Sequence, residues 1–146
     1  MRYRCHVKWM DTDYARVAHY QRFLSWVDDG FQAWCNARGI SFKEQIDHGI
    51  GWPLVDVSIR YLRPMTLEDE VLVSMVLEDV SSQGMTLDFT IARSDGKIAA
   101  RGHMKRRFVS QHDMQGSDAS LDLQAKLKAM RQEDADSELG GSPTAQ

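Results

Sequence analysis

HYQRFLSWVDDGFQAWCNAR, residues 19–38, decides the fold of this 146-residue chain. Its apolar side chains recur at the spacing of one helix face, and further aromatic residues widen that face. The members of this stripe are Leu24, Val27, Phe31, Trp34 and Cys35, flanked by Phe23 and Trp26. Such a broad stripe predicts one long helix that is buried on most sides. Gly39 follows the last periodic residue as a terminator, and Gly30 inside the helix predicts either a close approach by a neighbouring element or simple tolerance.

The segments on both sides of this helix have the period-two pattern of half-buried strands. Before the helix, residues 3–9 alternate apolar and charged side chains, which is typical of a strand. After it, residues 41–48 suit a short helical turn with Ser41 as N-cap and Glu44 three residues on. Four further strand-like runs follow, at residues 55–61, 71–77, 85–91 and 98–108. Short polar joints at 81–84 and 94–96 predict antiparallel hairpins.

One strand, one long apolar helix and four strands, in that order, predict an α+β fold. Five antiparallel strands can curl around the helix and bury it, which gives a single two-layer core. We expect this domain to span residues 1–110. Residues 111–146 form an acidic extension with seven acids and three bases. Within it, residues 119–131 suit a loose helix, and the polar stretch from residue 135 onward suits a disordered tail.

Composition argues against several classes of function. The net charge is −3 and residues 111–146 carry −4, so residues 1–110 carry only +1, which does not favour nucleic acid. No apolar run reaches the roughly 20 residues of a membrane helix, and the N-terminus lacks a secretory signal, so we expect a cytoplasmic protein. Cys5 and Cys35 have no metal-ligand spacing, and we expect reduced, packed thiols rather than a zinc site or a nucleophile.

The residues that carry chemistry lie between the first strand and the helix, in VKWMDTDYARVAHYQRFLSW, residues 7–26. Asp11 and Asp13 stand in the intervening loop. The helix N-terminus offers unpaired backbone N–H groups and a positive dipole, which would stabilise an oxyanion. A carboxylate beside it can attack a carbonyl carbon or deprotonate the water that does so. These are the parts of an acyl-transfer site, although two acids before a helix also serve as N-caps or solvated charges. We expect Asp11 to shape the loop.

Asp11-Thr12-Asp13 after a strand, an aromatic residue seven positions beyond Asp13 and an aromatic-rich helix resemble the 4-hydroxybenzoyl-CoA thioesterase family. That family includes bacterial acyl-CoA thioesterases encoded beside the Tol–Pal cell-envelope system. VDVSIRYLRPMTLEDEVLV, residues 55–73, is similar to the family's second and third strands. The resemblance covers residues 3–109. It implies a hotdog fold, in which a curled five-stranded antiparallel sheet wraps around one long buried helix.

The resemblance also implies a function. We expect hydrolysis of acyl- or aryl-CoA thioesters to a free acid and CoA, with no cofactor and no metal. Exposed sheet edges favour dimerisation, and hotdog relatives form homodimers or homotetramers with active sites between subunits. By position, the resemblance implies that Asp13 is the catalytic carboxylate and that the backbone N–H of Tyr20 polarises the thioester carbonyl.

The chain departs from the family just after Asp13, where Ala15 and Arg16 stand in place of the usual glycines. We expect Arg16 either to intrude on the pocket or to reach a substrate phosphate. Many members also have histidine or asparagine at the position of Tyr20. His19, one position earlier, is expected to be a second polar group of the site or else a surface residue at the helix start.

Coenzyme A carries several phosphates, so a basic strip near the site is expected. The candidates are Arg60 and Arg63 at the end of one strand, and Lys105 and Arg107, with Arg106 between them, on another. Such charges also protect exposed strands against sheet-to-sheet aggregation. Trp9 and the aromatic residues of the helix line either an acyl pocket or the core.

Three other functions stay open. The chain could hydrolyse thioesters of an acyl carrier protein, which its basic residues would dock. It could bind acyl ligands without turnover, as the missing glycines suggest, although the presence of Asp13 argues against this. It could also be a hydratase or dehydratase, with His19 and either Asp28 or Asp29 as the working residues.

Overall fold

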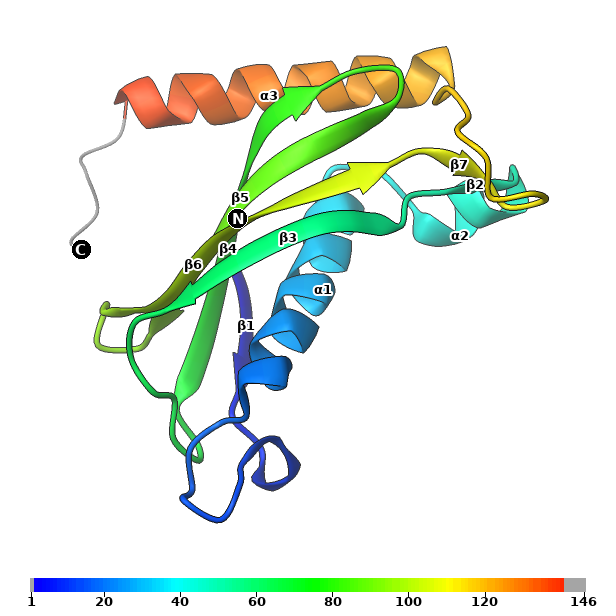
Figure 1. The fold of residues 1–146 in the computed structure, drawn as a ribbon. Helices are drawn as coiled ribbons and strands as arrows, with labels where there is room; N and C mark the ends of the chain where they lie inside the picture. The colour runs from blue at the N-terminus through cyan, green and yellow to red at the C-terminus, as the bar shows by residue number, and fades with distance from the viewer. Residues whose placement is uncertain (1, 141–146) are drawn as a thin grey trace.

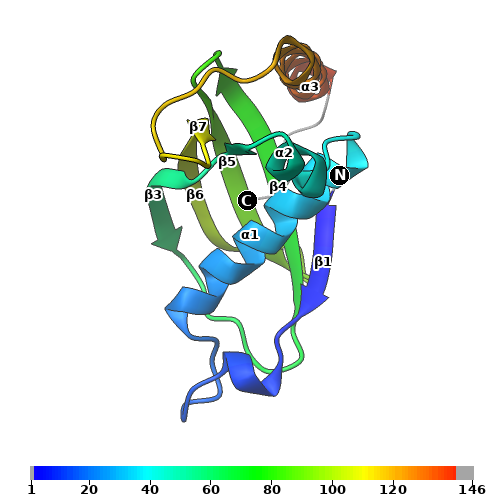
Figure 2. The same cartoon turned by 90° about the vertical axis from the view of Figure 1, so that its right-hand side faces the viewer.

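The computed structural model describes the backbone of residues 2–140. Its centre is a five-stranded antiparallel sheet in the order β1-β4-β5-β6-β3. The strands are β1 (Arg2–His6), β3 (Leu54–Tyr61), β4 (Glu70–Val80), β5 (Gly84–Arg93) and β6 (Ile98–Arg107). The helix α1 (Tyr20–Ala37) lies diagonally across one face of this sheet (Figure 1; Figure 2). The predicted α+β hotdog architecture, one curled sheet around one long helix, is confirmed.

Helix α1 supplies the centre of the core. Apart from Leu24, which is only partly buried, every member of the predicted stripe is buried, and Gly30 is buried with them: Phe23, Trp26, Val27, Gly30, Phe31, Trp34 and Cys35. Gly30 lies where α1 crosses β4. A Cβ atom at this position would lie 2.8 Å from Cγ1 of Val73, which is closer than such carbon atoms pack. Gly30 is therefore explained by close approach of α1 to β4.

Several short elements surround this frame. A 3-10 helix, η1 (Trp9–Asp11), follows β1, and α2 (Phe42–Asp47) follows α1. The predicted cap of α2 is confirmed, because the Ser41 side chain accepts a hydrogen bond of 3.2 Å from the backbone N–H of Glu44. Two-residue strands β2 (Ile50–Gly51) and β7 (Val109–Ser110) pair with each other. Two residues are too few to show an alternation of apolar and polar side chains, so the sequence did not predict these strands.

The acidic extension forms a longer helix than the sequence predicted. Helix α3 spans Leu121–Gly140, whereas helix was expected only to residue 131 and disorder from residue 135. Its start is anchored because Leu123, Leu127 and Met130 are buried in the hydrophobic cluster. Residues 141–146 of the expected tail lie outside the described residues.

Helix α3 also covers an open edge of the sheet. Among the described residues, strand β1 pairs with β4 only as far as Ser74, and no described strand pairs with the following residues of β4 on that side. There the backbone N–H of Leu77 donates to Oδ2 of Asp134 (2.9 Å), and Nε of Arg131 donates to the Glu78 carbonyl (2.8 Å). Asp134 is only 8% exposed, and its Oδ1 accepts from Nη2 of Arg38 at 3.1 Å. Figure 1 shows α3 lying across this end of the sheet.

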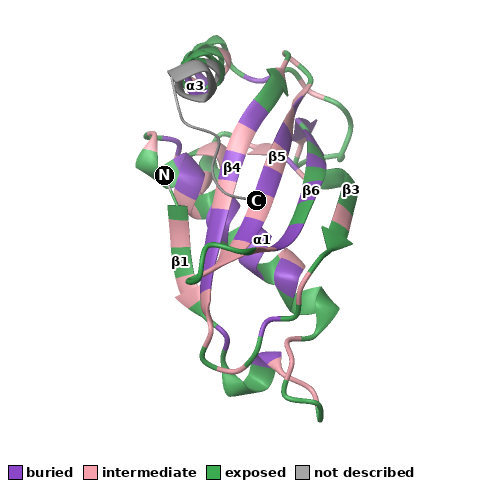
Figure 3. Ribbon diagram, turned by 90° about the vertical axis from the view of Figure 1, so that its left-hand side faces the viewer, coloured by how far each residue is buried: buried purple, intermediate pink, exposed green. Residues whose placement is uncertain are grey.

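The two outer strands differ from expectation in different ways. Strand β1 ends at His6 rather than near residue 9, and Trp9 is 78% exposed in η1 instead of facing the core. Strand β3 is a free edge and is exposed along most of its length (Figure 3). Four of its apolar side chains are exposed: Leu54, Val55, Val57 and Tyr61. An edge strand with this composition is incompletely covered in a single chain.

Candidate active site

The loop between η1 and α1 is a tight turn centred on residues 13–16. Thr12 pairs with Ala18, the N–H of Asp13 donates to the Val17 carbonyl at 3.1 Å, and the N–H of Arg16 donates to the Asp13 carbonyl at 3.0 Å. Closing this turn places Arg16 at φ 64°, a left-handed conformation that favours glycine. Arg16 occupies one of the two positions where the sequence lacks the expected glycines. The turn thus forms without glycine, and Arg16 adopts the conformation that glycine would adopt more easily.

Asp13 is partly exposed on this turn. Its Oδ1 accepts a hydrogen bond of 2.8 Å from the backbone N–H of Ala15, which fixes the direction of the carboxylate. The residue lines a hollow of about 330 Å³. The other lining residues come from the same loop, from η1 and from the loop before β4: Trp9, Thr12, Tyr14, Arg16 and Leu67.

Asp11 has a different environment and holds the loop against the helix start. It is 7% exposed. Its Oδ2 accepts from the backbone N–H of Lys8 at 2.8 Å, and its carbonyl accepts from the backbone N–H of His19 at 2.9 Å. Nε of Arg22 lies 3.8 Å from Oδ1. These contacts make Asp11 part of the loop framework, with its oxygens already engaged.

The start of α1 forms a second hollow. His19 is the N-cap and Tyr20 the first helical residue. The backbone N–H of Arg22 donates to the His19 carbonyl at 2.9 Å, and the N–H groups that begin a helix have no acceptor four residues earlier within it. The Tyr61 hydroxyl donates to the Tyr20 carbonyl at 2.9 Å. Burial, and to a lesser degree the Tyr20 phenol, raise the pKa of Tyr61. The hollow measures about 340 Å³ and is lined mainly by apolar groups: Val17, Ala18, Tyr20, Phe23, Tyr61, Leu62, Arg63 and Pro64.

Tyr61 was missed as a site residue in the sequence. The strand pattern placed it on the core face of its strand, and no sequence signal connects residues 20 and 61. Its ring lies edge-on to those of Tyr20 and Phe23, with centroids 6.5 Å and 5.1 Å away. Tyr61 therefore fixes the helix start against the end of β3.

The predicted basic residues fall into two separate groups. Arg63 lines the helix-start hollow and donates from Nη1 to the Ile98 carbonyl at 2.6 Å. Arg60 lies near this end of β3, beside Arg101 in the register. Lys105 and Arg107 lie at the far end of β6. Since Tyr61 pairs with Ala100, Lys105 and Arg107 lie five and seven residues further along β6, roughly 17 Å and 23 Å from that end.

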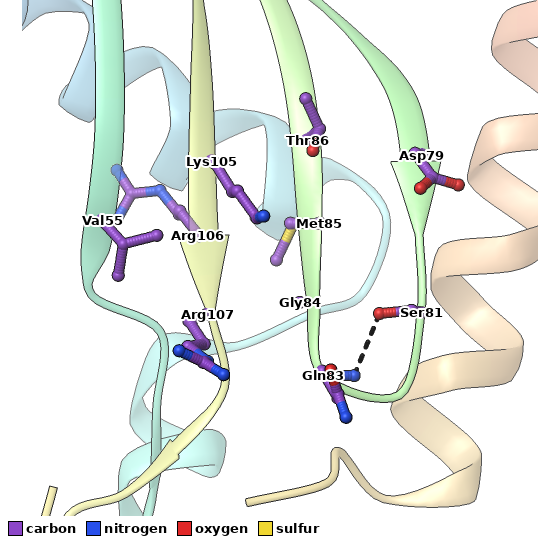
Figure 4. Close-up of a pocket in the computed structure, with 10 residues that line it drawn as sticks. All are labelled: Val55, Asp79, Ser81, Gln83, Gly84, Met85, Thr86, Lys105, Arg106 and Arg107. Atoms are coloured by element: carbon purple, nitrogen blue, oxygen red, sulfur yellow. Dashed lines mark hydrogen bonds between the residues drawn. The ribbon is translucent and has the colours of Figure 1, made fainter. Parts of the chain in front are cut away.

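Lys105 and Arg107 line a hollow of about 270 Å³ together with Arg106 and the β4–β5 hairpin (Figure 4). The hairpin contributes polar side chains to the wall: Ser81, Gln83 and Thr86. The fold of this one chain brings Asp13, Arg16, His19, Tyr20 and Arg63 to one end of the molecule and Lys105 and Arg107 to the other.

Other groups are unsuited to catalysis. Burial raises the pKa of Cys35 to about 12 and that of Cys5 to about 11, so neither thiol forms a thiolate near neutral pH. Among the described residues no cluster of acids, histidines and cysteines could hold a metal ion.

No described helix is both long and apolar enough to cross a membrane. Four aromatic residues of α1, Phe23, Trp26, Phe31 and Trp34, are buried in the core.

Comparison with protein-family models matches residues 7–127 to the thioesterase-like superfamily. The chain belongs to this superfamily. The matched region includes the Asp13 turn, all of α1 and four strands of the sheet.

Individual relatives are more distant. A 1,4-dihydroxy-2-naphthoyl-CoA hydrolase of Synechocystis is 27% identical over 86 residues, which are 58% of this chain and 62% of that enzyme. The chain thus spans just under two thirds of the length of this curated relative. A solved 1,4-dihydroxy-2-naphthoyl-CoA thioesterase from Synechocystis superimposes with a TM-score of 0.79 at 22% identity, over 87% of this chain and 94% of that one. A Staphylococcus aureus protein solved in complex with CoA gives a TM-score of 0.85 at 15% identity, over 99% and 94%. At these identities the solved structures establish the shared fold.

Proposed function

We propose that this protein hydrolyses CoA thioesters of acyl or aryl acids, with Asp13 as the reacting carboxylate. The observation that carries the proposal is the Asp13 turn, which presents a partly exposed carboxylate seven residues before the first residue of α1. This arrangement occurs in a chain of the thioesterase-like superfamily, and the names of the naphthoyl-CoA relatives support a CoA thioester as substrate. The narrower resemblance to 4-hydroxybenzoyl-CoA thioesterases is part of this proposal.

In the proposed reaction the thioester carbonyl lies at the start of α1. The backbone N–H of Tyr20 donates to the carbonyl oxygen, and the helix dipole stabilises the negative charge that develops there. Asp13 attacks the carbonyl carbon, the carbon–sulfur bond breaks, and CoA leaves as a thiolate that takes a proton from solvent. Water then hydrolyses the mixed anhydride and restores the Asp13 carboxylate. In the alternative route Asp13 removes a proton from water, which attacks the same carbon. His19 is the second polar group at this helix start.

The active unit is proposed to be a homodimer formed through β3. The exposed apolar side chains of this edge would be covered by a second copy, and closed two-fold symmetry is the commonest way to do so. Two β3 strands paired antiparallel place the C-terminal end of one beside the N-terminal end of the other. The helix-start hollow, which contains Tyr61, then faces the partner's Leu54, next to the partner's Arg106 in the register. A pair of such dimers would form the tetramer.

This dimer would bring together the two groups of basic residues that lie at opposite ends of one chain. Lys105 and Arg107 of one subunit approach the site of the other, where Arg63 and Arg16 already lie. Guanidinium and ammonium groups bind phosphate oxygens with charge-assisted hydrogen bonds. We therefore assign the hollow in Figure 4 to the phosphates of CoA, and Arg60 to the rim between the two groups.

The test is thioester hydrolysis on a panel of acyl- and aryl-CoAs, with release of free thiol as the readout. We expect wild-type turnover of at least one panel member and a loss of about 100-fold or more in kcat for Asp13→Asn. Asp122→Asn on α3 is the matched control, because it removes an exposed carboxylate far from the turn and should change nothing. Wild-type binding without hydrolysis of any CoA ester would refute the proposal and favour an acyl-ligand-binding protein. Turnover of acyl carrier protein thioesters alone would mean that the substrate is a thioester of that carrier protein and not of CoA.

A further inference from the structure

Arg106 is a charged residue on the buried face of β6. Its neighbours on that face are small or apolar, as Ala100, Gly102 and Met104 show, and the residue is only 8% exposed. The guanidinium lies 4.1 Å from the centre of the Phe31 ring. A buried cation among apolar residues costs stability unless it has partners.

The partners of Arg106 are incomplete. Nη2 donates to Oδ1 of Asp28 at 2.6 Å, and Nη1 donates to the Trp52 carbonyl at 3.2 Å. The Nε–H is buried and bonds no group among the described residues. Two of the five N–H donors of the guanidinium are thus engaged. Asp28, by contrast, is 67% exposed, so the ion pair stands at the boundary between core and open surface.

Arg106 lines two hollows: the one in Figure 4 and an apolar one of about 290 Å³ between α2, β2 and the segment that leads into β3. Most of its wall is hydrophobic: Phe42, Ile46, Ile50, Trp52 and Pro53. Two amides, Gln45 and Gln111, complete the lining. An apolar hollow with one cation in its wall has the character of a site for a hydrophobic acid.

The proposed dimer places this hollow beside the partner's active site. Leu54 pairs with Arg106. When antiparallel β3 strands pair about their middle, Leu54 lies opposite the partner's Tyr61, which borders the helix-start hollow. Arg106 and the partner's Tyr61 are then two strand spacings apart, about 10 Å between Cα atoms. Within its own subunit, Arg106 lies six residues along β6 from Ala100, the neighbour of Tyr61, or roughly 20 Å.

We propose that Arg106 determines acyl specificity at the active site of the partner subunit. Resting on the proposed thioesterase function, this inference names the substrate class: aromatic acyl groups that carry a second acidic oxygen, a carboxylate or a phenol. The aromatic ring would occupy the apolar hollow. The acidic oxygen would accept hydrogen bonds from the guanidinium, whose charge favours an anion. Asp28 would hold the guanidinium in place, as a positioning residue.

The first arm of the test compares benzoyl-CoA with benzoyl-CoAs that carry a hydroxyl or carboxylate at each ring position. For the best substituted ester we expect Arg106→Met to lower kcat/KM by roughly 10- to 100-fold more than for benzoyl-CoA, as expected when one charged hydrogen bond is lost. Methionine keeps the packing on Phe31, and Arg106→Lys, which keeps the charge, should recover part of the preference. Arg101→Gln, an exposed cation on the same strand, is the matched control. Equal losses on all esters would refute the inference and make Arg106 a structural residue.

The second arm tests whether Arg106 acts across the subunit boundary. Asp13→Asn and Arg106→Met chains are unfolded together, refolded as a mixture and assayed on the substituted ester. Random pairing makes about half of the dimers mixed. If Arg106 serves the partner's site, each mixed dimer has one intact site, and the mixture recovers about a quarter of wild-type activity. If Arg106 serves its own site, no intact site forms and the mixture shows only the average of its parents.

The third arm separates this inference from the proposed function. Binding of free hydroxybenzoic and dicarboxylic benzoic acids to wild type is followed by tryptophan fluorescence, since Trp52 lines the hollow. Suppose that the protein hydrolyses no thioester but binds these acids at least 10-fold more weakly after Arg106→Met. That result would refute the proposed thioesterase function and support the Arg106 binding site. If the protein hydrolyses thioesters but Arg106→Met leaves acid binding unchanged, the thioesterase function stands and the Arg106 binding site is refuted.

Discussion

Replacement of Asp134 tests whether α3 is part of the fold. Asp134→Ala removes the acceptor of the Leu77 N–H and the ion partner of Arg38. An unsatisfied buried N–H costs about 1–3 kcal/mol. The lost ion pair adds about 1 kcal/mol, less than for a fully buried pair, because Arg38 is 21% exposed and Glu133 lies 3.9 Å away. We therefore expect a loss of about 2–4 kcal/mol in the free energy of unfolding, which lowers Tm by about 5–15 °C for a chain of this size.

The assay is thermal and urea denaturation at neutral pH, with Asp136→Ala as the matched control. Asp136 lies about half a turn further along α3 and accepts from the side chain of Gln132 on the exposed surface, so its replacement should cost less than about 0.5 kcal/mol. Asp134→Asn keeps an acceptor for Leu77 and should fall between the two. If Asp134→Ala has the same Tm as the Asp136→Ala control, Asp134 does not stabilise the edge of β4 and the reasoning is wrong.

Three further predictions concern strain, packing and ionisation. Arg16→Gly should raise the free energy of unfolding in urea by about 0.5–1 kcal/mol, because glycine adopts φ 64° without strain; Arg16→Ala should show no gain. Gly30→Ala should lower it by about 1–3 kcal/mol despite the better helix propensity of alanine, and Val73→Ala in the same chain should relieve part of the loss. Because burial raises the pKa of Cys35 from 9.0 to about 12, the protonated thiol stabilises the fold fully below pH 9. Above pH 9 this contribution should fall by up to about 1.4 kcal/mol per pH unit. Urea denaturation between pH 8 and 11 should therefore show that the free energy of unfolding falls less steeply with pH in Cys35→Ala than in wild type.

Much of the fold was predictable because the sequence contains clear periods. The α1 stripe and the alternation in β3, β4, β5 and β6 placed these elements within a few residues of their observed bounds. The early end of β1 was not predictable, since Trp9 continues the alternation although its ring lies outside the core. The length of α3 was missed because its buried anchor is a polar residue. Asp134 is stabilised by tertiary contacts with Leu77 and Arg38, which local composition does not report.

The candidate site was predictable only in part. The Asp13 turn was found from the DxD spacing and the helix that follows. The contact of Tyr61 with Tyr20 joins residues 41 apart, and only the folded sheet shows it. Arg106 was counted as one of three basic residues in a row, whereas the strand period places its two neighbours outward and Arg106 inward. A stricter use of that period would have separated it from Lys105 and Arg107.

The covering of β4 by α3 has a consequence for how the chain is made. The ribosome completes β4 at Val80, and Asp134 follows 54 residues later. At an elongation rate of about 5–20 residues per second this interval is roughly 3–11 s. During that time the backbone N–H of Leu77 lacks its final acceptor, and the nascent sheet offers this edge to any other extended chain. The C-terminal helix therefore completes the protection of a strand that was synthesised well before it, and truncation ahead of Asp134 should appear first as aggregation during expression.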